Sequence, residues 1–198
     1  MTTRSTLAVC IFTFISALSI TSLASQSDPK RTGINFSQYQ VSFQKTLTTV
    51  PDNLSGIAYN SDTDSLFAII NNPEQIIELD KQGKILRQIA LNRFVDTEGI
   101  TYFGQGHFAL TQERQRSVSV VEITSLTRSI DVDDAKQFNL KPAIDNNARL
   151  EGIAWSPQSG LFVANEHSAS EIIHLPSTLI SGLGLHATDH GNIMQLSR

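Results

Sequence analysis

The chain has 198 residues, enough for one domain of ordinary size, and carries a formal net charge of -4. Charged residues make up only 17%, and no cluster of lysine and arginine marks a basic face, so we expect no nucleic acid among its partners. The single cysteine, Cys10, lies in an apolar N-terminal run, so a chain that loses this run has neither a disulfide nor a thiolate site.

The N-terminal segment is typical of a secretory signal peptide. A lone positive charge at Arg4 precedes a mostly apolar run, and the small residues Ser22 and Ala24 occupy the positions that a signal peptidase requires. We therefore expect residues 1–24 to be a signal peptide and residues 25–42 to form a linker or first strand. An uncleaved signal anchor is the alternative, because the run is close to the shortest length that spans a bilayer. Both interpretations predict an exported protein of the periplasm or the cell envelope, and the anchor adds association with the membrane.

A motif that occurs three times organises the rest of the chain. It reads SGIAY from Ser55, EGITY from Glu98 and EGIAW from Glu151, and two further apolar runs follow each copy. These runs are short, rich in β-branched and aromatic residues, and bounded by turn residues, so each predicts a β-strand. In the first copy the expected strands are residues 56–59, 66–70, 76–79 and 85–89, which predicts a four-stranded antiparallel meander.

The second and third copies repeat the first three of these strands. The expected strands are residues 99–102, 108–110 and 118–123 in the second copy, and residues 152–155, 161–164 and 172–175 in the third. A phenylalanine stands about ten residues after the glycine of each copy, at Phe67, Phe108 and Phe162, and the copies agree there within a residue or two. The second copy is longer than the first, and we assign the extra length to a polar insertion loop over residues 129–141.

This organisation predicts an all-β fold, a partial β-propeller over residues 43–198 built of four-stranded antiparallel blades. A lone meander cannot bury both of its faces, whereas blades stacked around an axis can. About three blades fit into the chain, whereas closed propellers have at least four. The blades are expected near residues 51–92, 94–141 and 148–198. We therefore expect either a C-terminally truncated propeller or self-association that covers the open blade edges.

Glutamates recur at one end of the expected inner strands. Glu98 and Glu151 directly precede the repeated glycine, and Glu113 and Glu166 end the second strand of the same copies. Because the inner strands of a propeller line its channel, these four side chains are expected to converge. Carboxylate oxygens are ligands that hard cations prefer, so the pattern predicts a Ca²⁺ or Mg²⁺ site. The alternative is that each glutamate accepts backbone N–H groups at a strand end, and Asp96 is interpreted as a polar turn residue.

Other side chains are assigned to structure rather than to chemistry. The aromatic residues Tyr59, Tyr102 and Trp155 share one repeat position, which indicates packing between blades. The histidines lack the short spacing of zinc ligands, and no GxSxG motif marks a nucleophilic serine. The sequence therefore predicts no catalytic residue, and whether the protein is an enzyme stays open.

The motifs also carry a family resemblance. From about Phe43 to Leu175, the order NLSGIAY, DTEGITY, LTQER and RLEGIAW resembles the bacterial SdiA-regulated propeller family. The resemblance implies an exported, five-bladed propeller, distantly similar to NHL-repeat propellers, with calcium bound at an acidic site. The acidic residues that match are Glu98, Glu113, Glu151 and Glu166. The later blades of the family have no counterpart here, which implies a truncated chain.

Three functions remain open on the sequence. The first is an exported cell-envelope propeller that binds Ca²⁺ and acts as a binding or scaffold module for a small molecule or an envelope protein. The second is a metal-dependent hydrolase, either a phytase-like phosphoesterase or a lactonase, in which a bound cation activates water. The third is a truncated remnant of a longer propeller.

Overall fold

The computed structural model describes residues 37, 39–50, 52–140, 149–166, 170–181, 185–187 and 193–195. The predicted signal segment, residues 1–24, lies outside these described residues. Two compact units are distinguished, Met1–Gln44 and Lys45–Arg198, and every strand belongs to the second. Within the described part of the chain, no helix has the length and apolar character needed to cross a membrane.

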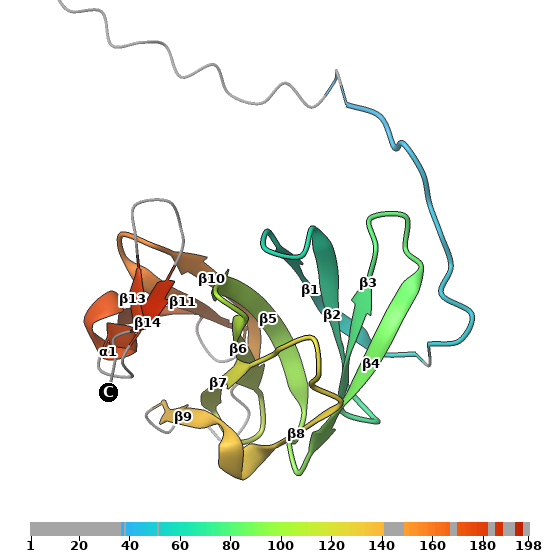
Figure 1. Cartoon of the computed structure of the whole chain (residues 1–198). Coiled ribbons are helices and arrows are strands. Elements are labelled where there is room, and N and C mark those ends of the chain that lie inside the picture. Colours follow the sequence, from blue (N-terminus) through green and yellow to red (C-terminus); the bar gives the residue numbers. More distant parts are fainter. Residues whose placement is uncertain are drawn as a thin grey trace, which may run out of the picture. The chain divides into compact units, whose positions relative to one another are not determined.

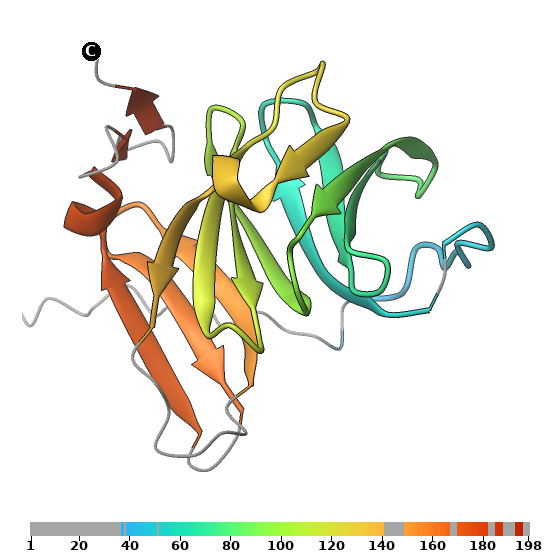
Figure 2. The ribbon, with the colours of Figure 1, turned by 90° about the horizontal axis from the view of Figure 1, so that it is seen from below.

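The second unit is all-β and is built on antiparallel meanders, as predicted (Figures 1 and 2). In the described residues its three large sheets contain five, four and three strands, rather than the predicted four each. The first sheet contains β1 (Leu54–Asn60), β2 (Ser65–Ile70), β3 (Gln75–Leu79), β4 (Ile85–Asn92) and β8 (Ser129–Asp131). The second contains β5 (Thr97–Gly104), β6 (His107–Gln112), β7 (Ser117–Glu122) and β9 (Lys136–Asn139). The third contains β10 (Leu150–Ser156), β11 (Gly160–Asn165) and β12 (Glu171–Pro176). A short helix α1 (Ser177–Ser181) and a hairpin of β13 (Leu185–Ala187) and β14 (Ile193–Gln195) follow.

The first strands of the three sheets, β1, β5 and β10, lie side by side (Figure 1). A Cβ atom added to Gly56 would lie 2.7 Å from the carbonyl oxygen of Glu98, and one added to Gly99 would lie 2.6 Å from that of Glu151. The pairing register of the first hairpin also shifts around the repeated glycine in all three sheets. The glycine is therefore repeated because it lets neighbouring backbones approach each other at an irregular position of the strand.

Apolar side chains fill the spaces on both sides of the second sheet. Toward the first sheet, Phe67 and Phe108 pack with their ring centroids 4.6 Å apart, in one cluster with Ile76 and Leu110. Toward the third sheet, the cluster includes Phe103, Val118, Val120, Leu150, Leu161 and Val163. The second sheet is therefore enclosed by its two neighbours.

The three phenylalanines, which the sequence aligns within a residue or two, do not share one position in the strand pairing. Phe67 and Phe162 each lie opposite the alanine two residues after the repeated glycine, whereas Phe108 lies opposite Tyr102, three residues after it. Because successive side chains of a strand point to opposite faces, this single step turns Phe108 toward the first sheet. Ala109 occupies the repeat position of the other two phenylalanines.

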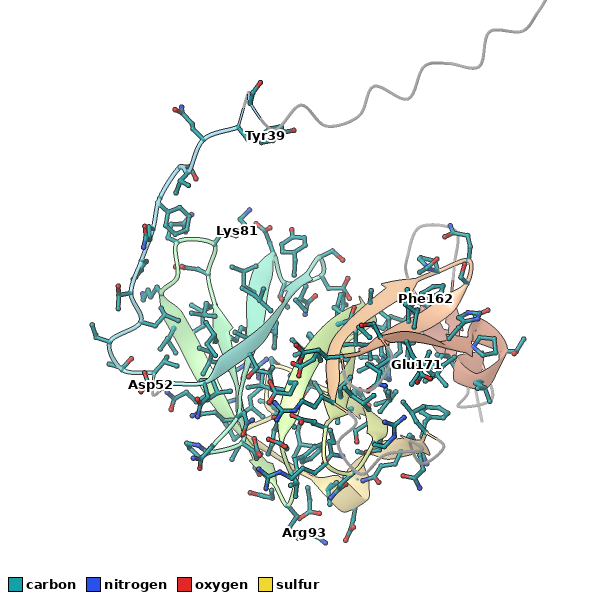
Figure 3. The ribbon with its side chains drawn as sticks, turned by 180° about the vertical axis from the view of Figure 1, so that it is seen from behind. Tyr39, Asp52, Lys81, Arg93, Phe162 and Glu171 are labelled. Carbon is teal, nitrogen blue, oxygen red and sulfur yellow. The ribbon has the colours of Figure 1, made fainter. Side chains whose placement is uncertain are left out.

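The predicted insertion loop over residues 129–141 is also wrong for the described residues 129–140. β8 pairs parallel with β4 and extends the first sheet, and β9 pairs with β7 as the fourth strand of the second sheet. Only the 3-10 turn between them, Val132–Asp134, is a polar connection. The Arg93 guanidinium pairs there with the carboxylates of Asp131 and Asp133 (Figure 3).

Packing between sheets is confirmed for two of the three repeated aromatic residues. The Trp155 ring lies 5.4 Å from that of Phe103, and Tyr102 packs against the cluster between the first two sheets. Tyr59 differs, because half of its surface (50%) is exposed and its hydroxyl group donates to Asp64 Oδ1 over 2.6 Å. Among the described strands, none packs a further sheet against the β1 side of the first sheet, so the side chain of Tyr59 has no described blade to pack against.

Candidate functional site

Acidic side chains gather where the second strand of each sheet ends beside the start of the first strand. One backbone hydrogen bond recurs there in all three sheets: Asn71 N to Asn53 O at 3.1 Å, Glu113 N to Asp96 O at 2.8 Å, and Glu166 N to Arg149 O at 2.9 Å. The same end of each meander is thereby fixed to the same end of its first strand. Because the first strands lie side by side, the residues at these ends come together.

Asp96, Glu98 and Glu113 form the centre of this carboxylate cluster. One carboxylate oxygen from each residue lies within 4.8 Å of the other two. Asp96 is 9% exposed, whereas Glu98 and Glu113 are half-buried. Asp96 has a φ of 57°, in the left-handed region that aspartate tolerates better than most residues.

An amide and two guanidinium groups surround the centre. Asn71 Nδ2 donates to Asp96 Oδ1 at 2.9 Å and to Glu98 Oε1 at 2.7 Å, which links the first sheet to the second. Arg114 Nε lies 2.8 Å from Asp96 Oδ2, and Arg149 Nε lies 3.5 Å from Glu113 Oε1. These contacts compensate part of the negative charge of the cluster.

An acidic residue of the turn between β2 and β3, Glu74, supports the backbone beneath the centre. Glu74 Oε1 accepts the backbone N–H of Asp96 at 2.7 Å, and Glu74 Oε2 accepts the Thr97 hydroxyl at 3.1 Å. Both oxygens of Glu74 therefore hold the chain that carries Asp96 and Glu98.

The third sheet adds a pair of carboxyl groups, those of Glu151 and Glu166, which lie near enough for the charge of Glu166 to act on Glu151. Burial raises the pKa of Glu151, and the negative charges of Glu98, Glu113 and Glu166 raise it further. Burial also raises the pKa of Glu113, with a further contribution from Asp96 that exceeds the opposing effect of Arg149. Negative charge is therefore in excess at this end of the inner strands.

The four predicted glutamates thus lie in one region, two in the centre and two in the pair of the third sheet. The sequence interpretation missed Asp96, which it treated as a turn residue, together with Asn71, Arg114 and Arg149. Asp96 and Arg149 share one repeat position, three residues before the repeated glycine, but their opposite charges hide any common role. Asn71 stands where the other copies have Glu113 and Glu166.

An open hollow of about 550 Å³ adjoins the carboxyl pair on the third sheet. Its described lining consists of Glu151, Ala164, Asn165, Glu166, Ser170, Glu171 and Ile172. Figure 3 shows Glu171 on this sheet. The volume lies within the range of small-molecule sites.

Comparisons with other proteins identify relatives of the chain. The sequence profile of the SdiA-regulated family matches residues 31–197. Among solved structures, the chain is similar to a protein of unknown function from Bacteroides caccae, whose crystal structure has a resolution of 1.35 Å. The two share 11% identity with a TM-score of 0.40 over 65% of this chain and 48% of that one. The chain thus spans about half the length of that protein.

Proposed function

The chain belongs to the SdiA-regulated family, and we propose that it is an exported cell-envelope protein that binds Ca²⁺ and acts as a binding or scaffold module. The observation that carries the proposal is the convergence of Asp96, Glu98 and Glu113, whose carboxylate oxygens lie within 4.8 Å of one another. The apolar N-terminal segment supports export, and the all-β fold supports a binding module rather than a particular reaction.

The chemistry of the donor set fits a hard cation. Calcium takes six to eight oxygen ligands, and this region offers carboxylate oxygens and the amide oxygen of Asn71. Asp96, Glu98 and Glu113 would hold the ion, with Glu151 and Glu166 beside it. A divalent cation would also relieve the repulsion that raises the pKa values of Glu113 and Glu151.

The basic residues set the expected strength of binding. Arg114 already pairs with Asp96, and Arg149 pairs with Glu113, so a cation competes with these guanidinium groups for oxygens. We therefore expect moderate rather than tight affinity, and a stronger response to calcium when Arg114, which is mostly exposed, is replaced by glutamine.

The test is a calcium titration of the full chain by calorimetry, combined with thermal melts. A site occupied at 100 times its dissociation constant stabilises a protein by about 2.7 kcal/mol, so the melting temperature should rise clearly. Glu98→Gln should abolish both the heat and the shift, whereas Glu122→Gln, an exposed carboxylate of β7, should preserve both. A wild-type chain that shows neither heat nor shift would reject the proposal.

The second candidate function, a metal-dependent hydrolase, gains support from one observation. Burial and the nearby carboxylates of Glu98, Glu113 and Glu166 raise the pKa of Glu151, which favours the protonated form that a general acid requires. The adjoining hollow has room for a small substrate. Turnover of a panel of phosphomonoesters and lactones, lost with a chelator and in Glu151→Gln, would favour this function, and no turnover across the panel would reject it.

A further inference from the structure

One apolar strip of the first sheet faces solvent. Leu54, Ile57 and Tyr59 of β1 are 52%, 60% and 50% exposed. Leu47 and Val50 cover the neighbouring part of this sheet face, over β2 and β3, and leave the β1 strip open. In the second sheet the residue that corresponds to Ile57 is Ile100, which is 5% exposed because it packs against the first sheet.

The third sheet is open on its other side, on the face that corresponds to the one by which the first sheet packs on the second. We call this face the front of the third sheet. Ala154, Ala164 and Ile172 are exposed there, Ile172 by 79%, and Phe162 is half-exposed (Figure 3). In the first sheet, the residue that corresponds to Phe162 is Phe67, which is 1% exposed against the second sheet. The front of the third sheet thus presents the surface that the other sheets bury.

The surroundings of the repeated glycine also show that the front of the third sheet is open. A Cβ atom on Gly56 or Gly99 would collide with the backbone of the next sheet, whereas one on Gly152 would meet only the Ala164 Cβ atom, at 3.7 Å. Gly152 therefore lies in a backbone arrangement suited to a neighbouring strand, and in the described residues no such strand is beside it.

We propose that the chain associates head to tail, with the front of the third sheet docked on the β1 strip of a second copy. A second copy is the occupant because the two open faces are the next members of the series of sheet contacts established inside the chain. Gly56 packs at the carbonyl oxygen of Glu98 and the N–H of Ile100, at 2.7 and 3.3 Å from its added Cβ. By the same repeat positions, Gly152 packs at the carbonyl oxygen of Ser55 and the N–H of Ile57 in the second copy.

Charge at the acidic end agrees with this contact. Inside the chain, the Asn71 amide donates to the Glu98 carboxylate across the first two sheets. Across the copies, Glu166 takes the position of Asn71, and Ser55 takes that of Glu98. A carboxylate therefore meets a neutral hydroxyl donor, and like charges are not brought together.

The contact is heterologous, since it uses two different faces of the protein. Such contacts close into a ring or continue as a filament, and each copy then buries both of its open faces. The inference does not depend on calcium binding, because apolar side chains and backbone atoms make the contact. Ala164 and Ile172 also line the hollow beside Glu151 and Glu166, so a docked copy covers part of that hollow.

The test measures the molar mass of the full chain by sedimentation and light scattering at micromolar concentrations. The molar mass of the wild type should be a multiple, at least two-fold, of the 21.8 kDa of one chain. Gly152→Val, which blocks the front of the third sheet, and Ile57→Asp, which charges the β1 strip, should each give a monomer. Mixed in equal amounts, the two variants should form a 1:1 heterodimer, because each retains one intact face that fits the other.

Leu126→Asp is the matched control, since Leu126 is an 83% exposed apolar side chain in a turn away from both faces. It should keep the wild-type mass. Thermal melts establish whether each variant is folded. If Gly152→Val does not fold, the molar mass of Ile57→Asp alone decides the outcome. A monomeric wild type, or oligomers that persist in both variants, would overturn the inference. Persistence in both variants is also what association through the apolar N-terminus would give.

Discussion

The second and third sheets carry the same repeated motif but differ in burial. All six residues of β6 are buried, and five of six in β7, because sheets lie against both faces. In β12 only one residue of six is buried, although this strand contains Ile172, Ile173 and Leu175. A strand in this fold is therefore buried by its neighbouring sheets, and its hydrophobic composition indicates only where a neighbour is expected.

The same contrast appears in side-chain chemistry. In the enclosed sheet, the polar residues Gln112, Ser117 and Ser119 are fully buried, and Gln112 Nε2 donates to Ser117 Oγ at 3.3 Å and to Ser119 Oγ at 2.8 Å. In the third sheet, the His174 ring lies in the open, stacked on Phe162 at a centroid distance of 4.7 Å. Enclosure therefore allows the second sheet to keep a buried polar network, which is stable only when all its members are paired.

Replacing Phe67 and Phe162, which share a repeat position, should give the largest difference. Phe67→Ala removes a side chain that is 1% exposed, so we expect a loss of about 3–5 kcal/mol in the free energy of unfolding. Phe162→Ala should cost less than about 1.5 kcal/mol, because part of this ring already contacts water. Urea denaturation at concentrations too low for association measures both. Equal losses would contradict the comparison and indicate that the front of the third sheet is covered.

The repeated glycines should give the next largest effect. Gly99→Ala places a Cβ atom 2.6 Å from the Glu151 carbonyl oxygen, so the two sheets must separate, at a cost of about 1–3 kcal/mol. Gly152→Ala meets only an ordinary contact and should change the free energy of unfolding by no more than about 0.5 kcal/mol. The measurement is again urea denaturation. A loss at Gly152 as large as that at Gly99 would show that the two positions are equally enclosed in the dilute protein.

Much of the fold follows from the sequence, because the repeat combines strand-forming residues with turn residues at fixed intervals. Two features do not. Phe108 stands nine residues after its glycine and Phe162 ten residues after its own, and the pairing register shows that this single step reverses the face of Phe108. β8 and β9 are short edge strands with polar side chains, so their composition is that of a loop, and their hydrogen bonds to β4 and β7 define them as strands.

The candidate site was predictable only where the copies agree. Glu98 and Glu151 share one repeat position and Glu113 and Glu166 another, and the inner strands bring these four residues to one region. Asp96 has asparagine and arginine at its equivalents, Asn53 and Arg149, so the repeat does not indicate a common role. Its role comes from burial and from contacts with Asn71 and Arg114, which depend on how the sheets pack.

The smallest expected effect is the change of stability with pH, which reports on the carboxyl groups at the acidic ends of the sheets. A raised pKa in the folded state means that the contribution of Glu151 is fully present below its ordinary value of 4.5 and is lost as the pH rises through the folded value. The calcium-free protein should therefore lose stability between acidic and neutral pH. Glu151→Gln should weaken this loss and raise the melting temperature at pH 7 by no more than about 2 °C, since solvent screens the group.

Calcium should reverse the direction in which Glu151→Gln changes the melting temperature. With calcium bound, Glu151 contributes favourable charge, so Glu151→Gln should reduce the calcium-induced rise in melting temperature while it stabilises the calcium-free protein. Glu122→Gln serves as the control, because this exposed carboxylate of β7 lies at the opposite end of the second sheet from Glu113. It should alter neither the pH profile nor the calcium response. A Glu151→Gln protein that is less stable than the wild type without calcium would mean that the carboxylate repulsion is already compensated within the chain.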